Sequence, residues 1–271
     1  MMGESKAQIL SQLRGLVAPC EPSLAGNAAS RTPWTRMAPG GLHEIAPQDW
    51  RDGPAALGVV LGLAASRAGP CVWIDHPALR RDFGLPYGPG LQGFGFDPGR
   101  LIHVMARTDT DLLWAMEEAA RLKGLGAVIG CLPAASKACT LTATRRLALA
   151  AASTGALVLM MRDAGPKGLS AAQTRWSVAT RPAPLSPRLS APLSTQPQSL
   201  LDSSSPLENI IGTLERPAPP RWQLTLEKCR AGKPGSWLIE WHDAALCFHL
   251  SAPSGDGPDQ ADRPAPAALA G

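Results

Sequence analysis

The residues that first suggest a chemical function lie between positions 40 and 65. A glycine turn and short strand (Gly40 to Ala46) lead through a loop into an apolar helix (Gly53 to Ala65). That order of strand, loop and helix is the frame in which a loop ending in Gly-Lys-Ser/Thr cradles nucleotide phosphates. The loop from Pro47 to Pro54 has no lysine for the β- and γ-phosphates and no hydroxyl placed for magnesium. The sequence therefore predicts a degenerate phosphate loop.

Five residues mark the remnant of a nucleotide site: Gln48, Asp49, Asp52, Gly53 and Asp75. The two loop aspartates would repel a triphosphate. Asp75 ends a short buried strand, where α/β proteins usually hold ligands, and His76 follows it. An acid–histidine pair could do general acid–base work, but no nucleophile or metal partner accompanies it, and a capped strand end is the simpler interpretation. We expect no catalytic residue, no metal site and no cofactor.

Two histidines and one glutamate lie inside or beside apolar runs. His43 and His103 are more readily interpreted as hydrogen-bonded core or edge residues than as metal ligands. Glu44, beside the degenerate loop, has the same structural interpretation.

The elements that must position these residues alternate along the chain. Short apolar strands are expected at residues 72–74, 101–106, 126–132 and 156–161, and helices at 111–123 and 141–154. Asp109 or Thr110 can cap the first of these helices, and Gly124 and Gly155 follow the C-terminal ends of the two helices. Such alternation predicts an α/β fold with a mostly parallel sheet covered on both faces.

Composition divides the chain of 271 residues into five parts. Residues 1–39 form an N-terminal helix and a turn-rich lead-in, and residues 40–180 form the α/β core. Residues 181–220 are a Pro/Ser-rich linker or loop, and 251–271 a tail expected to be disordered. Residues 221–250 are a C-terminal β segment with a hairpin, in which residues 248–250 could add a short third strand. Tryptophans at alternating positions of the β segment favour core packing over base stacking.

The overall composition excludes several classes of protein. The net charge of +4 permits contact with nucleic acid without demanding it, and the six cysteines include no C-x-x-C pair, which favours reduced thiols. The N-terminus lacks the apolar region of a signal peptide, and no run is long enough to span a bilayer. We expect a cytoplasmic protein with no membrane partner.

The order of these segments resembles the RecA core, with every position that would touch ATP altered; Gly130 stands where a magnesium-binding aspartate would lie. More closely, the chain resembles the ImuA family. The resemblance is carried by these stretches, in this order: Leu42-His43-Glu44-Ile45, Tyr87-Gly88-Pro89-Gly90-Leu91, Gly95-Phe96-Asp97-Pro98-Gly99-Arg100-Leu101, Leu113-Trp114-Ala115-Met116-Glu117-Glu118, Arg145-Arg146-Leu147-Ala148-Leu149-Ala150, Thr174-Arg175-Trp176 and Pro234-Gly235-Ser236-Trp237.

This resemblance implies a RecA-like P-loop NTPase core that has lost catalysis and serves as a scaffold in SOS-induced translesion synthesis. The implied partners are an ImuB-like Y-family polymerase homologue and, indirectly, an error-prone C-family polymerase, with RecA and single-stranded DNA as further partners. A protein of this kind would be nucleoid-associated when induced.

Two sets of residues are candidates for binding. Six basic residues follow the expected strands and would form a weak, sequence-independent DNA surface: Lys137, Arg145, Arg146, Arg162, Lys167 and Arg175. For Arg145 and Arg146 an ordinary solvated helix face is an equal alternative. On the N-terminal helix, Ile9, Leu13 and Leu16 share an apolar side that could dock on a partner.

Two other functions stay open at this point. One is a divergent ATPase of RecA type that uses an unusual loop around residues 48–53. The other is a regulator of cell division linked to the SOS response, because vestigial RecA-like folds also occur there.

Overall fold

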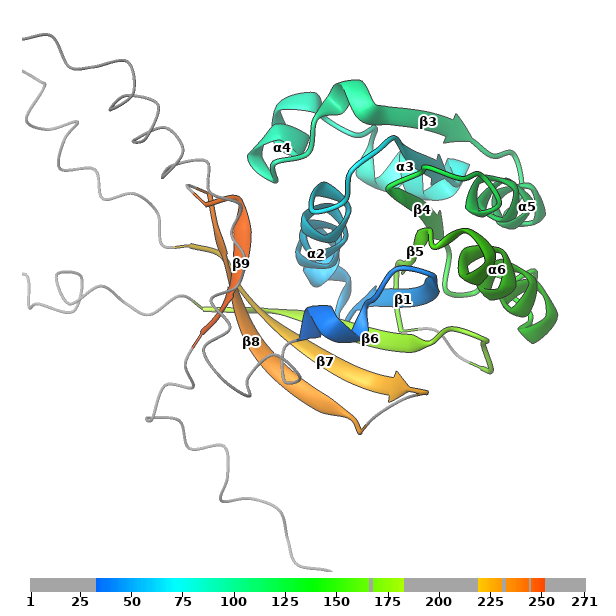
Figure 1. Cartoon of the computed structure of the whole chain (residues 1–271). Coiled ribbons are helices and arrows are strands. Elements are labelled where there is room, and N and C mark those ends of the chain that lie inside the picture. Colours follow the sequence, from blue (N-terminus) through cyan, green and yellow to red (C-terminus); the bar gives the residue numbers. More distant parts are fainter. Residues whose placement is uncertain (1–32, 166–167, 183–218, 231–232, 244, 252–271) are drawn as a thin grey trace, which may run out of the picture.

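The computed structural model describes residues 33–165, 168–182, 219–230, 233–243 and 245–251 (Figure 1). The expected N-terminal helix, most of the Pro/Ser-rich segment and the C-terminal tail lie outside the described residues. Within them, one nine-stranded sheet runs in the order β3-β2-β4-β5-β1-β6-β7-β8-β9.

Six strands form the parallel part of this sheet. They are β1 (Gly41–Pro47), β2 (Cys71–Asp75), β3 (Leu101–Met105), β4 (Ala127–Leu132), β5 (Leu157–Arg162) and β6 (Thr174–Arg181). All pairings among them are parallel. Their short apolar runs suit strands that are covered on both faces. The prediction of a mixed α/β fold with a mostly parallel sheet is thus confirmed.

Helices cover the two faces of the parallel strands. On one face lie α2 (Gly53–Ala65), α3 (Pro77–Phe83) and α4 (Gly88–Gly93); on the other lie α5 (Asp109–Ala120) and α6 (Leu141–Thr154). The 3-10 helices η2 (Pro33–Arg36), η3 (Trp50–Asp52) and η4 (Pro98–Arg100) occupy connections.

Local capping chemistry sets the limits of the two helices on the second face. Thr108 caps α5, one residue before the residues expected for that role, by accepting a hydrogen bond from the backbone N–H of Asp111. Thr140 caps α6 in the same way. Gly155 ends α6 with a φ of 76°, which glycine adopts without strain.

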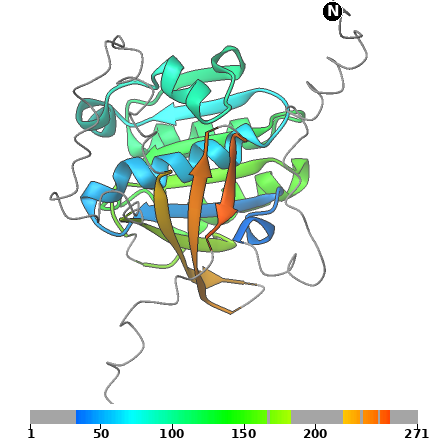
Figure 2. The ribbon, with the colours of Figure 1, turned by 90° about the vertical axis from the view of Figure 1, so that its left-hand side faces the viewer.

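The C-terminal strands continue the same sheet in antiparallel fashion. They are β7 (Arg221–Cys229), β8 (Gly235–His242) and β9 (Cys247–Leu250), and β7 pairs with β6. Figure 2 shows these yellow-to-red strands crossing over α2. The predicted hairpin and the possible third strand at residues 248–250 thus form one three-stranded extension, which packs on α2 of the core.

Glycines allow the close approach of α2 and these strands. A Cβ at Gly58 would lie 2.5 Å from the ring of Trp222, and one at Gly62 would lie 2.3 Å from the ring of Phe248. In the described part of the chain, no helix is long and apolar enough to cross a membrane.

Candidate functional site at the carboxyl edge of the parallel sheet

The loop from Pro47 to Pro54, which was predicted to be a degenerate phosphate loop, folds onto its own side chains. Asp49 accepts a hydrogen bond from the backbone N–H of Arg51 (3.1 Å), and Asp52 accepts one from the backbone N–H of Asp49 (3.1 Å). This reciprocal pair is a capping box that starts η3. Backbone groups that could meet a phosphate are thus partly occupied by carboxylates of the loop itself.

The loop is also fastened to strand β6. The backbone N–H of Gln48 donates to the carbonyl of Val178 (2.8 Å), and that of Thr180 donates to Asp52 (2.8 Å). Burial acts to raise the pKa of Asp52, but the hydrogen bonds from Thr180 and Asp49, with Arg181 nearby, outweigh it and lower the pKa. Both aspartates thus hold the loop in place, and the lowered pKa keeps Asp52 charged.

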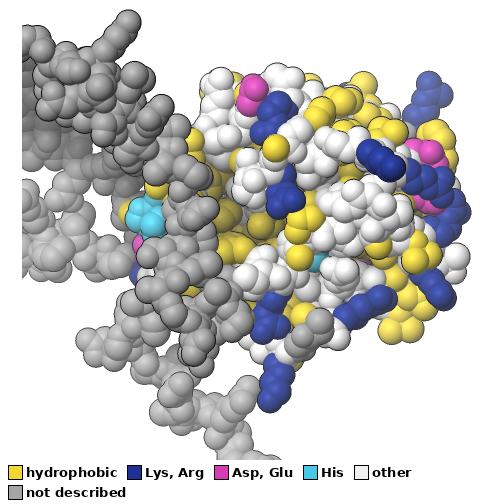
Figure 3. Space-filling view, viewed as in Figure 1, with side chains coloured by type: hydrophobic (Ala, Val, Ile, Leu, Met, Phe, Trp, Pro, Cys, Tyr) yellow, Lys and Arg dark blue, Asp and Glu magenta, His cyan; other side chains and the backbone are white. Residues whose placement is uncertain are grey.

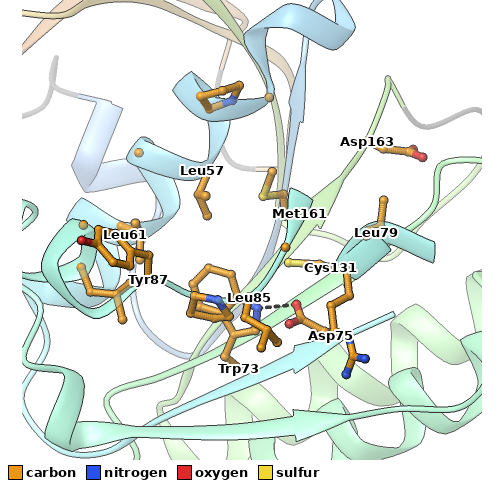
Figure 4. Close-up of a pocket in the computed structure, with 18 of the residues that line it drawn as sticks. Leu57, Leu61, Trp73, Asp75, Leu79, Leu85, Tyr87, Cys131, Met161 and Asp163 are labelled. Atoms are coloured by element: carbon orange, nitrogen blue, oxygen red, sulfur yellow. Dashed lines mark hydrogen bonds between the residues drawn. The ribbon is translucent and has the colours of Figure 1, made fainter. Parts of the chain in front are cut away.

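A pocket of about 400 Å³ opens at this edge, beside the N-terminal end of α2 (Figure 4). Its side chains come from α2, β2, α3, the connection to α4, and the ends of β4 and β5. The apolar ones include Leu57, Leu61, Trp73, Leu79, Leu85, Tyr87, Cys131 and Met161. Of the five predicted nucleotide-site residues, Gly53 and Asp75 line this pocket, whereas Gln48, Asp49 and Asp52 do not.

Asp75 is the buried acid of the pocket, and its partners differ from the one that sequence suggested. One carboxylate oxygen accepts the indole N–H of Trp73 (2.6 Å), and the other lies 2.7 Å from Nε2 of His103 on β3. His76 points elsewhere: its Nδ1 accepts from the backbone N–H of Ala78, and its Nε2 lies 2.9 Å from Asp109. The suggested acid–base pair of Asp75 and His76 is therefore not assembled.

The end of β4 corrects a second expectation. Gly130 faces α5, where an added Cβ would lie 2.1 Å from the sulfur of the fully buried Met116. The neighbouring Cys131 faces the pocket with Asp75 and is buried, which raises the pKa of its thiol, with a further contribution from the Asp75 charge. The residue at the pocket end of β4 is thus a protonated thiol. Within the described residues, no group of histidine, cysteine and acidic side chains is arranged to hold a metal ion.

Two of the stretches that carry the family resemblance pair directly on β1 and β6. His43 lies opposite Thr174, Glu44 opposite Arg175, and Ile45 opposite Trp176. Nδ1 of the buried His43 lies 2.7 Å from the Thr174 hydroxyl, which accepts the indole N–H of Trp176.

The same strand pair holds an ion pair between Arg175 and the fully buried Glu44 (2.8 Å). The structural interpretation of His43 and Glu44 therefore agrees with their contacts.

The six predicted DNA-binding residues fall into different environments. Lys137 and Arg145 are exposed, whereas Arg146 pairs with Glu117 (2.8 Å). Arg162 does not reach the surface: it is buried and donates to the carbonyls of Pro133 and Ala134. Arg175 is held by Glu44. Lys167 lies outside the described residues, as do Ile9, Leu13 and Leu16.

Comparison with known proteins relates the chain to a bacterial protein over most of its length. The chain is 33% identical over 221 residues to Protein ImuA of Caulobacter vibrioides, in strains NA1000/CB15N and ATCC 19089/CIP 103742/CB 15, with 76% of each protein covered. No protein-family model matches the sequence. The crystal structure of SulA from Pseudomonas aeruginosa overlaps 45% of this chain and 96% of its own, with 20% identity and a TM-score of 0.36. That overlap is too slight to carry an argument about function.

Proposed function

The chain belongs to the ImuA family, and we propose that it is a non-catalytic RecA-like adaptor of SOS-induced mutagenesis. It would bind an ImuB-like Y-family polymerase homologue and, through it, an error-prone C-family polymerase. RecA and single-stranded DNA are further proposed partners.

One observation carries the non-catalytic part of this proposal: the phosphate loop uses its own carboxylates as backbone caps. Asp49 and Asp52 occupy N–H groups of the loop, and the adjoining pocket presents apolar side chains beside α2. A lysine, a magnesium-binding hydroxyl and a catalytic acid each contribute orders of magnitude to phosphoryl transfer. A loop without them favours a role in binding over a role in turnover.

The ATPase alternative can be tested directly. Purified chain is expected to release no phosphate from Mg-ATP above a buffer control. Turnover that disappears in the variant Asp49→Ala/Asp52→Ala, while far-UV circular dichroism stays unchanged, would contradict the proposal and establish a divergent ATPase.

The adaptor role is tested by affinity capture of tagged chain from DNA-damaged cells, followed by mass spectrometry. The expected result is recovery of the Y-family polymerase homologue together with the error-prone polymerase. Recovery of cell-division proteins in their place would instead support a division regulator.

For direct DNA contact, the structure narrows the useful variants to Lys137 and Arg145. Both are exposed and form no ion pair with a described residue, whereas the equally exposed Arg146 pairs with Glu117. The variant Lys137→Glu/Arg145→Glu is expected to weaken single-strand binding and to flatten its dependence on salt. An unchanged affinity and salt slope would remove direct DNA contact at these positions from the proposal.

A further inference from the structure

The pocket beside Asp75 adjoins a second hollow, and together they form a groove of mixed character. The second hollow, of about 460 Å³, is lined by Asp75, His76, Pro77, Arg80, Met105, Ala106 and Arg107. Asp75 and Arg80 line both hollows. The groove therefore passes from apolar side chains at α2 to a basic region at the end of β3.

The exposed charged side chains of this groove are arginines, whereas its two carboxylates are engaged in hydrogen bonds. Asp75 already meets Trp73 and His103, and one oxygen of Asp163 accepts the backbone N–H of Ala134 (2.6 Å). Arg80 and Arg107 are exposed, and neither forms an ion pair with a carboxylate of the described residues. Arg80 donates one N–H to the sulfur of Met105. A carboxylate brought by a ligand could meet the other N–H groups of Arg80 and the guanidinium of Arg107.

Large apolar side chains are exposed at the mouth of the groove. Leu85 is 59% exposed, Tyr87 71%, and Met105 60%. Exposed apolar side chains gathered at a concave site mark a binding surface more often than singly scattered ones do. On the face seen in Figure 3, apolar side chains lie among dark-blue lysines and arginines, while magenta carboxylates show in few places.

We propose that this groove binds a short acidic segment of a protein partner. One or two bulky aliphatic or aromatic side chains of that segment enter the apolar pocket, and neighbouring carboxylates meet Arg80 and Arg107. The inference rests on the proposed adaptor function and specifies the chemistry of the partner segment. A nucleotide is a poorer fit, because the nearby loop has no lysine and its backbone N–H groups are partly occupied by Asp49 and Asp52.

The test has two stages with the full chain. Retention of the purified Y-family polymerase homologue on immobilised chain tests the adaptor function. Fluorescein-labelled overlapping peptides covering that homologue are then titrated with the chain by anisotropy. The tightest-binding peptide is remade with its Asp and Glu residues as Asn and Gln. Mg-ATP is tested as a competitor.

Two groove variants and two matched controls decide the outcome. Arg80→Glu and Tyr87→Ser are each expected to lower the affinity of the chain for the peptide about tenfold. Lys123→Glu makes the same change from positive to negative charge at an exposed position just after α5, and Trp114→Ser removes a comparably exposed aromatic (60%) on α5. Both controls should leave the affinity unchanged. The amide version of the peptide is also expected to bind about tenfold more weakly.

The failures of the two ideas are distinguishable. If the homologue is retained but no peptide responds to the groove variants, the groove inference is wrong and the adaptor function stands. If the homologue is not retained, the adaptor function fails, and absence of peptide binding rejects the groove as well. Displacement of the peptide by Mg-ATP, with ATP affinity lost in Arg80→Glu, would make the groove a nucleotide site and overturn the inference.

Discussion

At the scale of single residues, the best-defined chemistry belongs to a buried hydrogen-bonded chain across β1 and β6. The indole of Trp176 donates to the Thr174 hydroxyl, that hydroxyl meets Nδ1 of His43, and Nε2 of His43 lies 2.9 Å from the carbonyl of Ala38. The arrangement is consistent when Nε2 carries the proton and Nδ1 accepts. A second proton on His43 would leave Nδ1–H facing a hydroxyl already aligned to donate.

A pH dependence follows from this chain. Burial lowers the pKa of His43 below its usual 6.5, although the Ala38 carbonyl opposes the shift. Between the lowered pKa and 6.5 the unfolded chain binds the proton and the folded chain does not, so the free energy of unfolding falls as pH drops below 6.5. Urea unfolding of wild type and His43→Gln from pH 7.5 to 5 tests this. The variant should be less stable at pH 7.5 and lose less stability on acidification. Parallel curves for the two proteins would show that another group carries the dependence.

Arg175 stabilises the fold, whether or not it also contacts DNA. Its guanidinium pairs with the fully buried Glu44, one of whose oxygens has no hydrogen-bond partner among the residues that the structure describes. We expect Arg175→Leu to lower the free energy of unfolding by about 3–5 kcal/mol, because an unpaired carboxylate stays in the core. Glu44→Leu/Arg175→Leu should lose much less than the sum of the single variants. Additive losses in chemical denaturation would show that the two groups are not coupled.

The sequence drew attention to these residues, but it did not predict which residues they contact. The stretches containing His43 and Arg175 stood out because of the family resemblance. Their contacts join positions 131 residues apart, and they depend on the register of two parallel strands. For the same reason the partner of Asp75 was missed: His103 comes from β3, whereas His76, adjacent in sequence, is drawn away by α3 and Asp109.

At the scale of elements, helix α2 is packed between two parts of the sheet, the parallel strands and the antiparallel strands β7 to β9. One side packs on the parallel strands, and its glycines face the aromatic side chains of β7 to β9. This helix could be predicted from an apolar run without polar positions, because a helix that is buried on several sides needs no polar stripe. The sequence did not predict why glycines occur in this helix. The rings of Trp222 and Phe248, which pack against two of them, belong to strands far along the chain.

Gly62→Ala on α2 should be destabilising. In an exposed helix that change stabilises by about 1 kcal/mol, but here the added Cβ would lie 2.3 Å from Phe248. We expect a net loss of about 1–3 kcal/mol in thermal or urea unfolding, from overpacking. Gly93→Ala in α4 is the matched control, since nothing lies within 4 Å of its added Cβ. Partial rescue by Phe248→Leu should follow; a stabilised Gly62→Ala protein would mean the contact yields freely.

Other elements show where local patterns stop being informative. The parallel strands were recognisable as short apolar runs ended by turn residues. The short helices α3 and α4 were not assigned from sequence, because each has only six or seven residues and begins beside proline. Their importance lies in the pocket wall that they supply, through Leu79 and Leu91.

At the scale of the whole molecule, the sheet passes from parallel to antiparallel pairing without a break. Trp176 on β6 lies 5.6 Å from Trp237 on β8, measured between ring centroids, and both belong to the layer around α2. Composition alone separated residues 221–250 from the core, because a Pro/Ser-rich stretch precedes them. Composition shows where a chain lacks core-forming residues, but it does not show which strands pair. The hydrogen bonds between β6 and β7 join the C-terminal strands to the sheet of the core.

A chain that ends at Arg181 should therefore fail to fold cooperatively. It would lose β7 to β9, expose β6 as an edge strand, and uncover Trp176 and the glycine side of α2. We expect dye binding to exposed apolar surface, weak amide protection in β1 to β5, and no sharp urea transition. A chain ending at Ser251 keeps every described element and is the control, expected to unfold in one transition. If the shorter chain were soluble with native-like protection in β1 to β5, the antiparallel strands would be an independent addition, and the adaptor's binding surfaces on the two parts could be studied separately.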